Sequence, residues 1–184
     1  MLVVALCASC AGKKQVAQAT TNAFGIDLDM PCAEYGMDND DYFRATGTGT
    51  NLNLENARAD ALVNAQAMVN RKLGGYVQGL STDYSRNVRG DNAKASKVQS
   101  IIEGEFARLV EEKLDHAQQT CEKLKIMPDG NYMSFISIQI PKKELLDDLT
   151  NALSENEELE IEFNRNEFRK FAEEKMAKMK EAQK

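Results

Sequence analysis

The stretch 42–73, YFRATGTGTNLNLENARADALVNAQAMVNRKL, restricts the fold of this chain more than any other part of the sequence. Its first residues alternate in character, which predicts a short strand over 42–48. Gly47 and Gly49 are expected to mark the exit from that strand. A G-x-G between a strand and a helix can also hold phosphate, but neither a third glycine nor a phosphate-loop lysine follows it here. The pattern therefore favours a tight turn into a helix.

A long helix is predicted to begin near Asn53, because asparagine is a favoured N-cap and Glu55 lies in the first turn, where the helix dipole stabilises an acid. Small and apolar residues recur at spacings of three and four and form one stripe. The stripe contains Leu54, Ala57, Ala61, Leu62, Ala65, Met68, Val69 and Leu73. Its alanines should let the helix approach a sheet closely. Gly74 and Gly75 are expected to end or weaken the helix.

The second half of the chain supplies further helices and a hairpin. A helix is predicted over about 96–114. Two strand-like runs follow, 115–127 and 131–140, separated by the turn Pro128-Asp129-Gly130. Pro141 then opens a short helix at a position where proline is tolerated. The predicted fold class is therefore α+β: a small antiparallel sheet covered by a long alanine-faced helix and further helices, plus a C-terminal amphipathic helix.

Residues 154–184 are predicted to form that charged C-terminal helix, with its acids first and its lysines last, as the helix dipole favours. Two interpretations remain open. The helix either packs on its own domain or binds a protein partner through its apolar residues. The partner-binding candidates are Phe163, Phe168, Phe171 and Met179.

The N-terminus, MLVVALCASCAGKK, has the form of a bacterial lipoprotein signal peptide, an apolar run that ends in small residues before a cysteine. It resembles the lipobox, with Ala8 and Ser9 preceding an acylated Cys10. Acylation of Cys7 would place bulky Leu6 at the cleavage point, so Cys10 is preferred. We therefore expect a remnant signal peptide over 1–10 and a membrane anchor at diacylated Cys10.

Residues 11–41 are predicted to be a flexible tether ending in a polar loop, and residues 42–153 the folded α+β domain. Two cysteines lie outside the N-terminal pair: Cys32 in the loop and Cys121 in a hairpin strand. An exported protein meets an oxidising compartment, where two thiols tend to pair. A Cys32–Cys121 disulfide is one expectation; two free thiols, with Cys121 buried as a small hydrophobe, is the alternative.

Composition excludes several classes of function. The chain carries 23 basic and 29 acidic residues, a formal charge of −6, which argues against nucleic-acid binding. With one histidine, a zinc site has too few ligands. Asp115 and His116 are neighbours that should point to opposite faces of a strand, so they would rarely share acid–base work. We predict no enzyme activity, no catalytic residue, no metal and no cofactor.

Three segments resemble the Lpp-twenty family of small bacterial envelope lipoproteins, and the resemblance covers about 42–150. They are FRATGTG, ENARADALVNAQAMVNRKL and KIMPDGNYMSFISIQI. The remaining features look like those of related lipoproteins from Bacteroides-type bacteria. The resemblance implies helices on one face of a small antiparallel sheet. It implies no enzyme activity and transfers no active-site residues.

These observations predict a non-enzymatic lipoprotein of the outer membrane that binds a protein partner or supports envelope assembly. The residues after Cys10 lack the acidic run that resembles a surface-export signal, which favours the periplasmic face over the cell surface. The alternative is a binding module for a small molecule or glycan of the cell envelope, in a cleft between helices and sheet. The oligomeric state stays open.

Overall fold

The computed structural model divides the chain into two compact units, residues 1–30 and 31–184. It describes residues 21–22, 25–26, 30–87, 92–159 and 163–182. In the first unit, strands β1 (Thr21–Asn22) and β2 (Gly25–Ile26) form one short antiparallel pair. The second unit holds a three-stranded antiparallel sheet with helices, so the predicted α+β class is confirmed.

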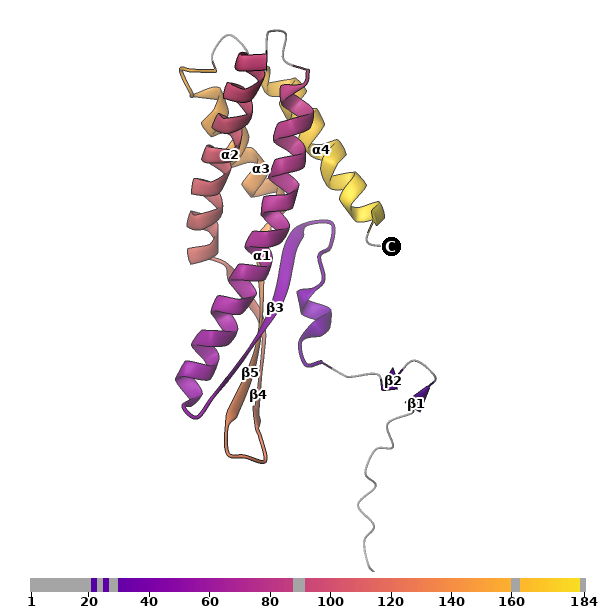
Figure 1. Ribbon diagram of the computed structural model, residues 1–184, viewed down its shortest axis with the longest axis vertical. Helices are drawn as coiled ribbons and strands as arrows, with labels where there is room; N and C mark the ends of the chain where they lie inside the picture. The colour runs from indigo at the N-terminus through magenta and orange to yellow at the C-terminus, as the bar shows by residue number, and fades with distance from the viewer. Residues whose placement is uncertain (1–20, 23–24, 27–29, 88–91, 160–162, 183–184) are drawn as a thin grey trace, which may run out of the picture. The chain divides into compact units, whose positions relative to one another are not determined.

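The sheet has the order β3-β5-β4, with β5 in the middle (Figure 1). Its strands are β3 (Tyr42–Asn51), β4 (Gln118–Ile126) and β5 (Tyr132–Pro141). Strands β4 and β5 form the predicted hairpin, and Gly130 adopts the left-handed conformation, with φ 85°, in its turn. The central strand has the longest buried run, as expected of a strand paired on both sides.

Helix α1 (Leu54–Ser85) covers one face of the sheet (Figure 1). The backbone of its alanine row lies against Gly47 and Gly49 of β3. The side chain of Asn53 caps it as predicted, accepting from the backbone N–H groups of Glu55 and Asn56 at 2.8 and 3.1 Å. Ala57, Ala61 and Ala65 are fully buried. The row continues through Val69 and Leu73, whereas Met68, expected in the stripe, is 42% exposed.

Gly47 and Gly49 do not end the strand, so the prediction of a turn there was wrong. Strand β3 continues through both glycines to Asn51. A Cβ atom at Gly47 would overlap the α1 backbone at Ala61 and Ala65, and one at Gly49 would overlap it at Ala57 and Ala61. The glycines of β3 and the alanines of α1 therefore form one close helix–strand contact, with small residues on both sides.

Helix α1 also runs without interruption through Gly74 and Gly75, where an end or weakening was expected. Two glycines in a helix interior cost about 1 kcal/mol each. The last three turns recover this cost by burying apolar and aromatic side chains against the later helices. These residues are Tyr76, Val77, Leu80 and Tyr84.

Three more helices complete the second unit: α2 (Asn92–Asp115), α3 (Lys142–Ser154) and α4 (Arg165–Ala182). Helix α2 packs on α1 and α3, and α4 packs on α1 and α3. Pro141 precedes α3 as predicted. Helix α4 begins about ten residues later than the predicted C-terminal helix, and the Asn164 side chain accepts from the Glu167 N–H at its start. Across the described residues, no helix has the length and apolarity needed to cross a bilayer.

One buried polar group in the sheet lacks a partner. The Ser134 hydroxyl on β5 is fully buried and has no hydrogen-bond partner among the described residues. We expect Ser134→Ala to raise the free energy of unfolding by up to about 1 kcal/mol, because it removes a desolvated hydroxyl. Urea denaturation measures this. The control is Ser137→Ala, which removes a hydroxyl on the same strand that does form hydrogen bonds and should lower the free energy of unfolding. A loss of stability in Ser134→Ala would contradict the prediction.

Candidate functional site

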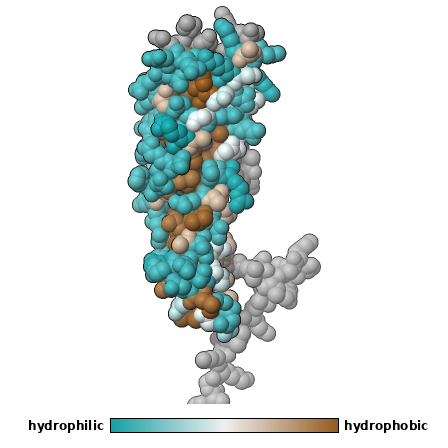
Figure 2. All heavy atoms as spheres, turned by 60° about the vertical axis from the view of Figure 1, so that its left-hand side comes forward, coloured by the Kyte–Doolittle hydropathy of each residue, from teal (hydrophilic) through white to brown (hydrophobic). Residues whose placement is uncertain are grey.

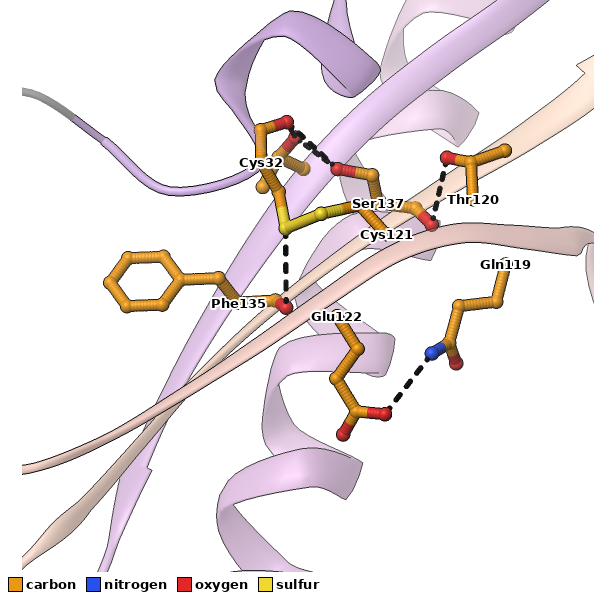
Figure 3. Close-up of a disulfide and its surroundings, with 8 residues drawn as sticks. Cys32, Gln119, Thr120, Cys121, Glu122, Phe135 and Ser137 are labelled. Atoms are coloured by element: carbon orange, nitrogen blue, oxygen red, sulfur yellow. Dashed lines mark hydrogen bonds between the residues drawn. A yellow bond between two sulfur atoms is a disulfide. The ribbon is translucent and has the colours of Figure 1, made fainter.

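The sheet face opposite α1 carries the segment 31–41, which we call the N-terminal strap. It contains a short 3₁₀ helix, η1 (Ala33–Gly36), that lies against β3 and β5. Figure 3 shows that a disulfide joins Cys32 of the strap to Cys121 of β4, with 5.8 Å between the two Cα atoms. The bond crosses 89 residues of sequence. The predicted pairing is confirmed, and the alternative of two free thiols is excluded.

Hydrogen bonds add to the disulfide in placing Cys32. Its carbonyl oxygen lies 3.0 Å from the hydroxyl oxygens of both Thr46 and Ser137, which are 2.6 Å from each other. The two hydroxyls carry one proton each, so only two of these three contacts are hydrogen bonds at any one time. Either both hydroxyls donate to the carbonyl, or one donates to the carbonyl and the other donates to the first hydroxyl. Cys32 has φ 62°, a left-handed conformation that is unfavourable for a residue with a side chain. The hydrogen bonds and the disulfide together hold it there.

A second anchor holds the other end of the strap. The Asp38 side chain is 4% exposed and accepts from Lys72 Nζ of α1 at 2.9 Å and from the Arg44 N–H of β3 at 2.6 Å. The strap therefore passes around the β3 edge and bonds to α1. Residues 31–41, assigned to the tether and loop from sequence, belong to the folded unit because two of their side chains are buried in it.

The proposed lipid-attachment residue, Cys10, lies outside the described residues, and so does the remnant signal peptide. The side chain of Met179 is also outside the described part. Acylation of Cys10 and partner binding through Met179 therefore stay predictions.

The three phenylalanines proposed for partner binding face inward. Phe168 is completely buried, and Phe163 and Phe171 are partly buried in the same core. All three rings surround Tyr84 of α1, with ring centroids 5.2 to 6.0 Å from its ring. The Tyr84 hydroxyl also accepts from the Asn164 N–H at 2.9 Å. The rings dock α4 onto the chain's own α1, which agrees with the interpretation that the helix packs on its own domain and leaves them unsuited to a partner-binding surface.

Truncation of the Phe168 side chain should therefore act on stability. We expect Phe168→Ala to lower the free energy of unfolding by about 3 kcal/mol, because it leaves a cavity beneath α4. Chemical denaturation followed by circular dichroism measures this. Arg169→Ala, at the neighbouring half-exposed position, should cost less than about 1 kcal/mol. Equal losses in the two variants would contradict the docking role of Phe168.

Apolar side chains are exposed instead at the free end of the sheet, which we call the hairpin end. The strand register places Asn51, Ile126 and Tyr132 side by side there. Leu52 is 77% exposed, Ile126 74% and Leu124 47%. Figure 2 shows apolar atoms among polar ones at the lower end of the folded unit, where Figure 1 places the β4–β5 turn. Most large apolar residues are buried in proteins, so a cluster this exposed is informative.

Two lysines alternate with these aliphatic residues along β4. Lys123 and Lys125 point to the strap side of the sheet, while Leu124 and Ile126 point to the α1 side. Both lysines are exposed, and neither has a carboxylate partner in the described part of the chain. On the α1 side, Glu122 accepts from Arg58 at 2.6 and 2.9 Å, and this hydrogen bond lowers the Glu122 pKa. Near the β4–β5 turn, β4 thus has aliphatic residues on its α1 side and lysines on its strap side.

His116 is exposed at the end of α2 and lines a pocket of about 230 Å³ between α2, α3 and the sheet. Most polar groups around it already bond to one another. Gln139 donates to Gln118 at 2.7 Å, and Lys113 bonds to Glu144 and Asp148. The pocket is smaller than ligand sites usually are and presents few unpaired polar groups. It is a poor location for the small molecule or glycan of the alternative prediction.

Comparison of the chain with protein-family models, with curated proteins and with solved structures gave no match in any of the three. The resemblance to the Lpp-twenty family therefore stays a prediction.

Proposed function

We propose that this protein is a non-enzymatic lipoprotein of the outer membrane, periplasm-facing, whose folded unit binds a protein partner and so supports envelope assembly. The observation that carries the proposal is the Cys32–Cys121 disulfide. Disulfides persist in oxidising compartments and are rare in the reducing cytosol. The bond lies in the strap, the first part of the folded unit after residues 1–30. A load on an N-terminal anchor would therefore reach the sheet at Cys32, through the disulfide to β4 and the hydrogen bonds to β3 and β5.

The hairpin end is the surface best suited to the partner. Its apolar face supplies the area that would be removed from water, at about 25 cal/mol per Å². Its lysines favour a partner with acidic side chains. A second copy of the chain fits less well: the antiparallel β4–β4 registers that place Leu124 opposite Leu124 or Ile126 of the second copy also place lysines opposite each other. The partner we propose is a different protein with an acidic, partly apolar strand or helix.

Acylation is tested by growing the native bacterium with an alkyne fatty acid and isolating the protein. We expect the label in wild type and in Cys7→Ala, and its loss in Cys10→Ala. Fractionation should place the labelled protein in the outer membrane. Label retained in Cys10→Ala, or a protein recovered from the cytosol with its cysteines reduced, would contradict the proposal.

Partner binding is tested with a photo-crosslinking residue at position 126 of the full chain. We expect one defined adduct, identified by mass spectrometry, that Lys123→Glu/Lys125→Glu abolishes. The matched control places the same residue at Val63 of α1, which is 61% exposed and lies outside the hairpin end. The same adducts at both positions, or adducts insensitive to the charge reversal, would contradict the proposed surface.

A further inference from the structure

A cleft of about 370 Å³ lies between the C-terminal end of α1 and α4. Its lining is Asp83, Arg86, Asn87, Phe171, Glu174, Lys175 and Lys178. At 1.5 Å per residue, Arg86 is about 45 Å along α1 from the hairpin end. The cleft is thus a separate feature from the proposed partner surface. Its volume falls within the lower part of the range for ligand sites.

One wall of the cleft is built by a lysine that crosses α1. The Lys175 side chain occupies the space that a Cβ atom at Gly79 would take. Its Nζ reaches Asp83 of α1 at 2.9 Å. The stem of Lys175 is therefore fixed at both ends, so this wall has a defined position. The absence of a side chain at Gly79 makes that arrangement possible.

The charges in the cleft do not balance. Asp83 is paired with Lys175, and Glu174 has Lys170 on its own helix as a neighbour at 4.0 Å. Arg86 and Lys178 are exposed, and neither has a carboxylate within salt-bridge distance among the residues described here. The hydrogen bond from Lys175, with the charges of Lys175, Arg86 and Lys178, lowers the Asp83 pKa. In a chain of net charge −6, this is a local excess of positive charge.

An aromatic ring adds an apolar surface to these cations. Phe171 is partly buried and meets Tyr84 edge-on, with centroids 6.0 Å apart and an interplanar angle of 81°. This contact holds the ring in place, while part of it lines the cleft. An amphipathic anion needs positive charge for its acidic group and an apolar surface for its body. Arg86 and Lys178 supply the charge, and the fixed ring of Phe171 supplies the surface.

We propose that this cleft binds a small organic anion. The phosphate or carboxylate group pairs with Arg86 and Lys178, and an aromatic or similarly flat apolar body lies against Phe171. An arginine binds either oxyanion through two parallel hydrogen bonds, and the lysine adds a second positive charge. The inference does not rest on partner binding, because it uses other residues at the other end of α1.

The test is calorimetric titration of the full chain with phenyl phosphate, benzoate and inorganic phosphate. We expect phenyl phosphate to bind at least about tenfold more tightly than inorganic phosphate, because only the former uses the ring. Benzoate reports whether a carboxylate serves as well as a phosphate. Equal binding of phenyl phosphate and inorganic phosphate would overturn the amphipathic site, and no detectable binding of all three at millimolar concentration would overturn the cleft.

Variants locate the binding. Arg86→Gln and Lys178→Gln should each weaken phenyl phosphate binding about tenfold, as loss of a hydrogen bond to a charged group implies. Lys123→Gln removes the same charge from an exposed position on β4, outside the cleft lining, and should change the affinity less than twofold. Unchanged thermal melting would show that all three variants are folded. Equal weakening by all three would indicate nonspecific attraction and overturn the proposal.

Discussion

Removal of the Cys32–Cys121 disulfide by Cys32→Ser/Cys121→Ser is expected to lower the free energy of unfolding by about 4–5 kcal/mol. The bond closes a loop of 89 residues, and in the chain-entropy model a loop of that length loses this much freedom in the unfolded chain. The loss is a large fraction of the 5–15 kcal/mol that stabilises typical domains. Chemical denaturation of oxidised wild type and of the variant measures it.

The same substitution should also release the strap. Cys32 keeps the hydrogen bonds that its carbonyl oxygen accepts from Thr46, Ser137 and the Tyr35 N–H, but its unfavourable φ of 62° is no longer enforced by a covalent bond. We expect limited proteolysis to cut within 31–41 in the variant and not in wild type. Wild type treated with a reductant serves as the control and should match the variant. Resistance of the variant to cleavage, together with an unchanged denaturation midpoint, would contradict the structural role of the bond.

Gly47→Val is expected to destabilise the protein by about 5 kcal/mol or more, although valine favours strands. Any Cβ at Gly47 overlaps the α1 backbone at Ala61 and Ala65, so the helix has to move away from β3. That movement would open a contact in which Ala61 and Ala65 are fully buried. Overfilling a packed core usually costs about 1–3 kcal/mol, and backbone atoms cannot turn aside as side chains do. Expression level and denaturant midpoint report the effect.

The matched control is Gly74→Ala in α1. A Cβ atom there meets nothing within 4 Å, and alanine is about 1 kcal/mol more favourable than glycine in a helix interior. This variant should therefore be more stable than wild type. Gly47→Val would then lower the free energy of unfolding, and Gly74→Ala would raise it. If Gly47→Val were tolerated with a loss below about 1 kcal/mol, the close contact described between α1 and β3 would be incorrect.

Local signals in the sequence predicted several elements correctly because each depends on neighbouring residues. The Asn53 cap, the alanine row and the turn at Pro128-Asp129-Gly130 are set by interactions within a few positions. The Cys32–Cys121 pair was predictable for a different reason. Outside the N-terminal pair the chain has two cysteines, so an exported domain can form one intramolecular disulfide between them.

Predictions from the sequence were wrong, or left two interpretations open, where a residue serves a distant contact. Gly47 and Gly49 resembled turn residues because their neighbour, α1, approaches only after folding. Phe168 resembled part of an exposed helix stripe because its partner, Tyr84, is 84 positions earlier. The hairpin end and the α1–α4 cleft gave no local signal, since each is assembled from separate segments.

The sequence by itself determined the α+β class, the order of most elements and the chemistry of the cysteines, because propensity, periodicity and turn residues act over short distances. The tertiary structure decided which side chains are available to other molecules. It buried the phenylalanines of α4 around Tyr84, placed the strap across the sheet and left Leu52, Leu124 and Ile126 exposed. Exposure depends on which surfaces meet across the whole chain, and no local pattern contains that information.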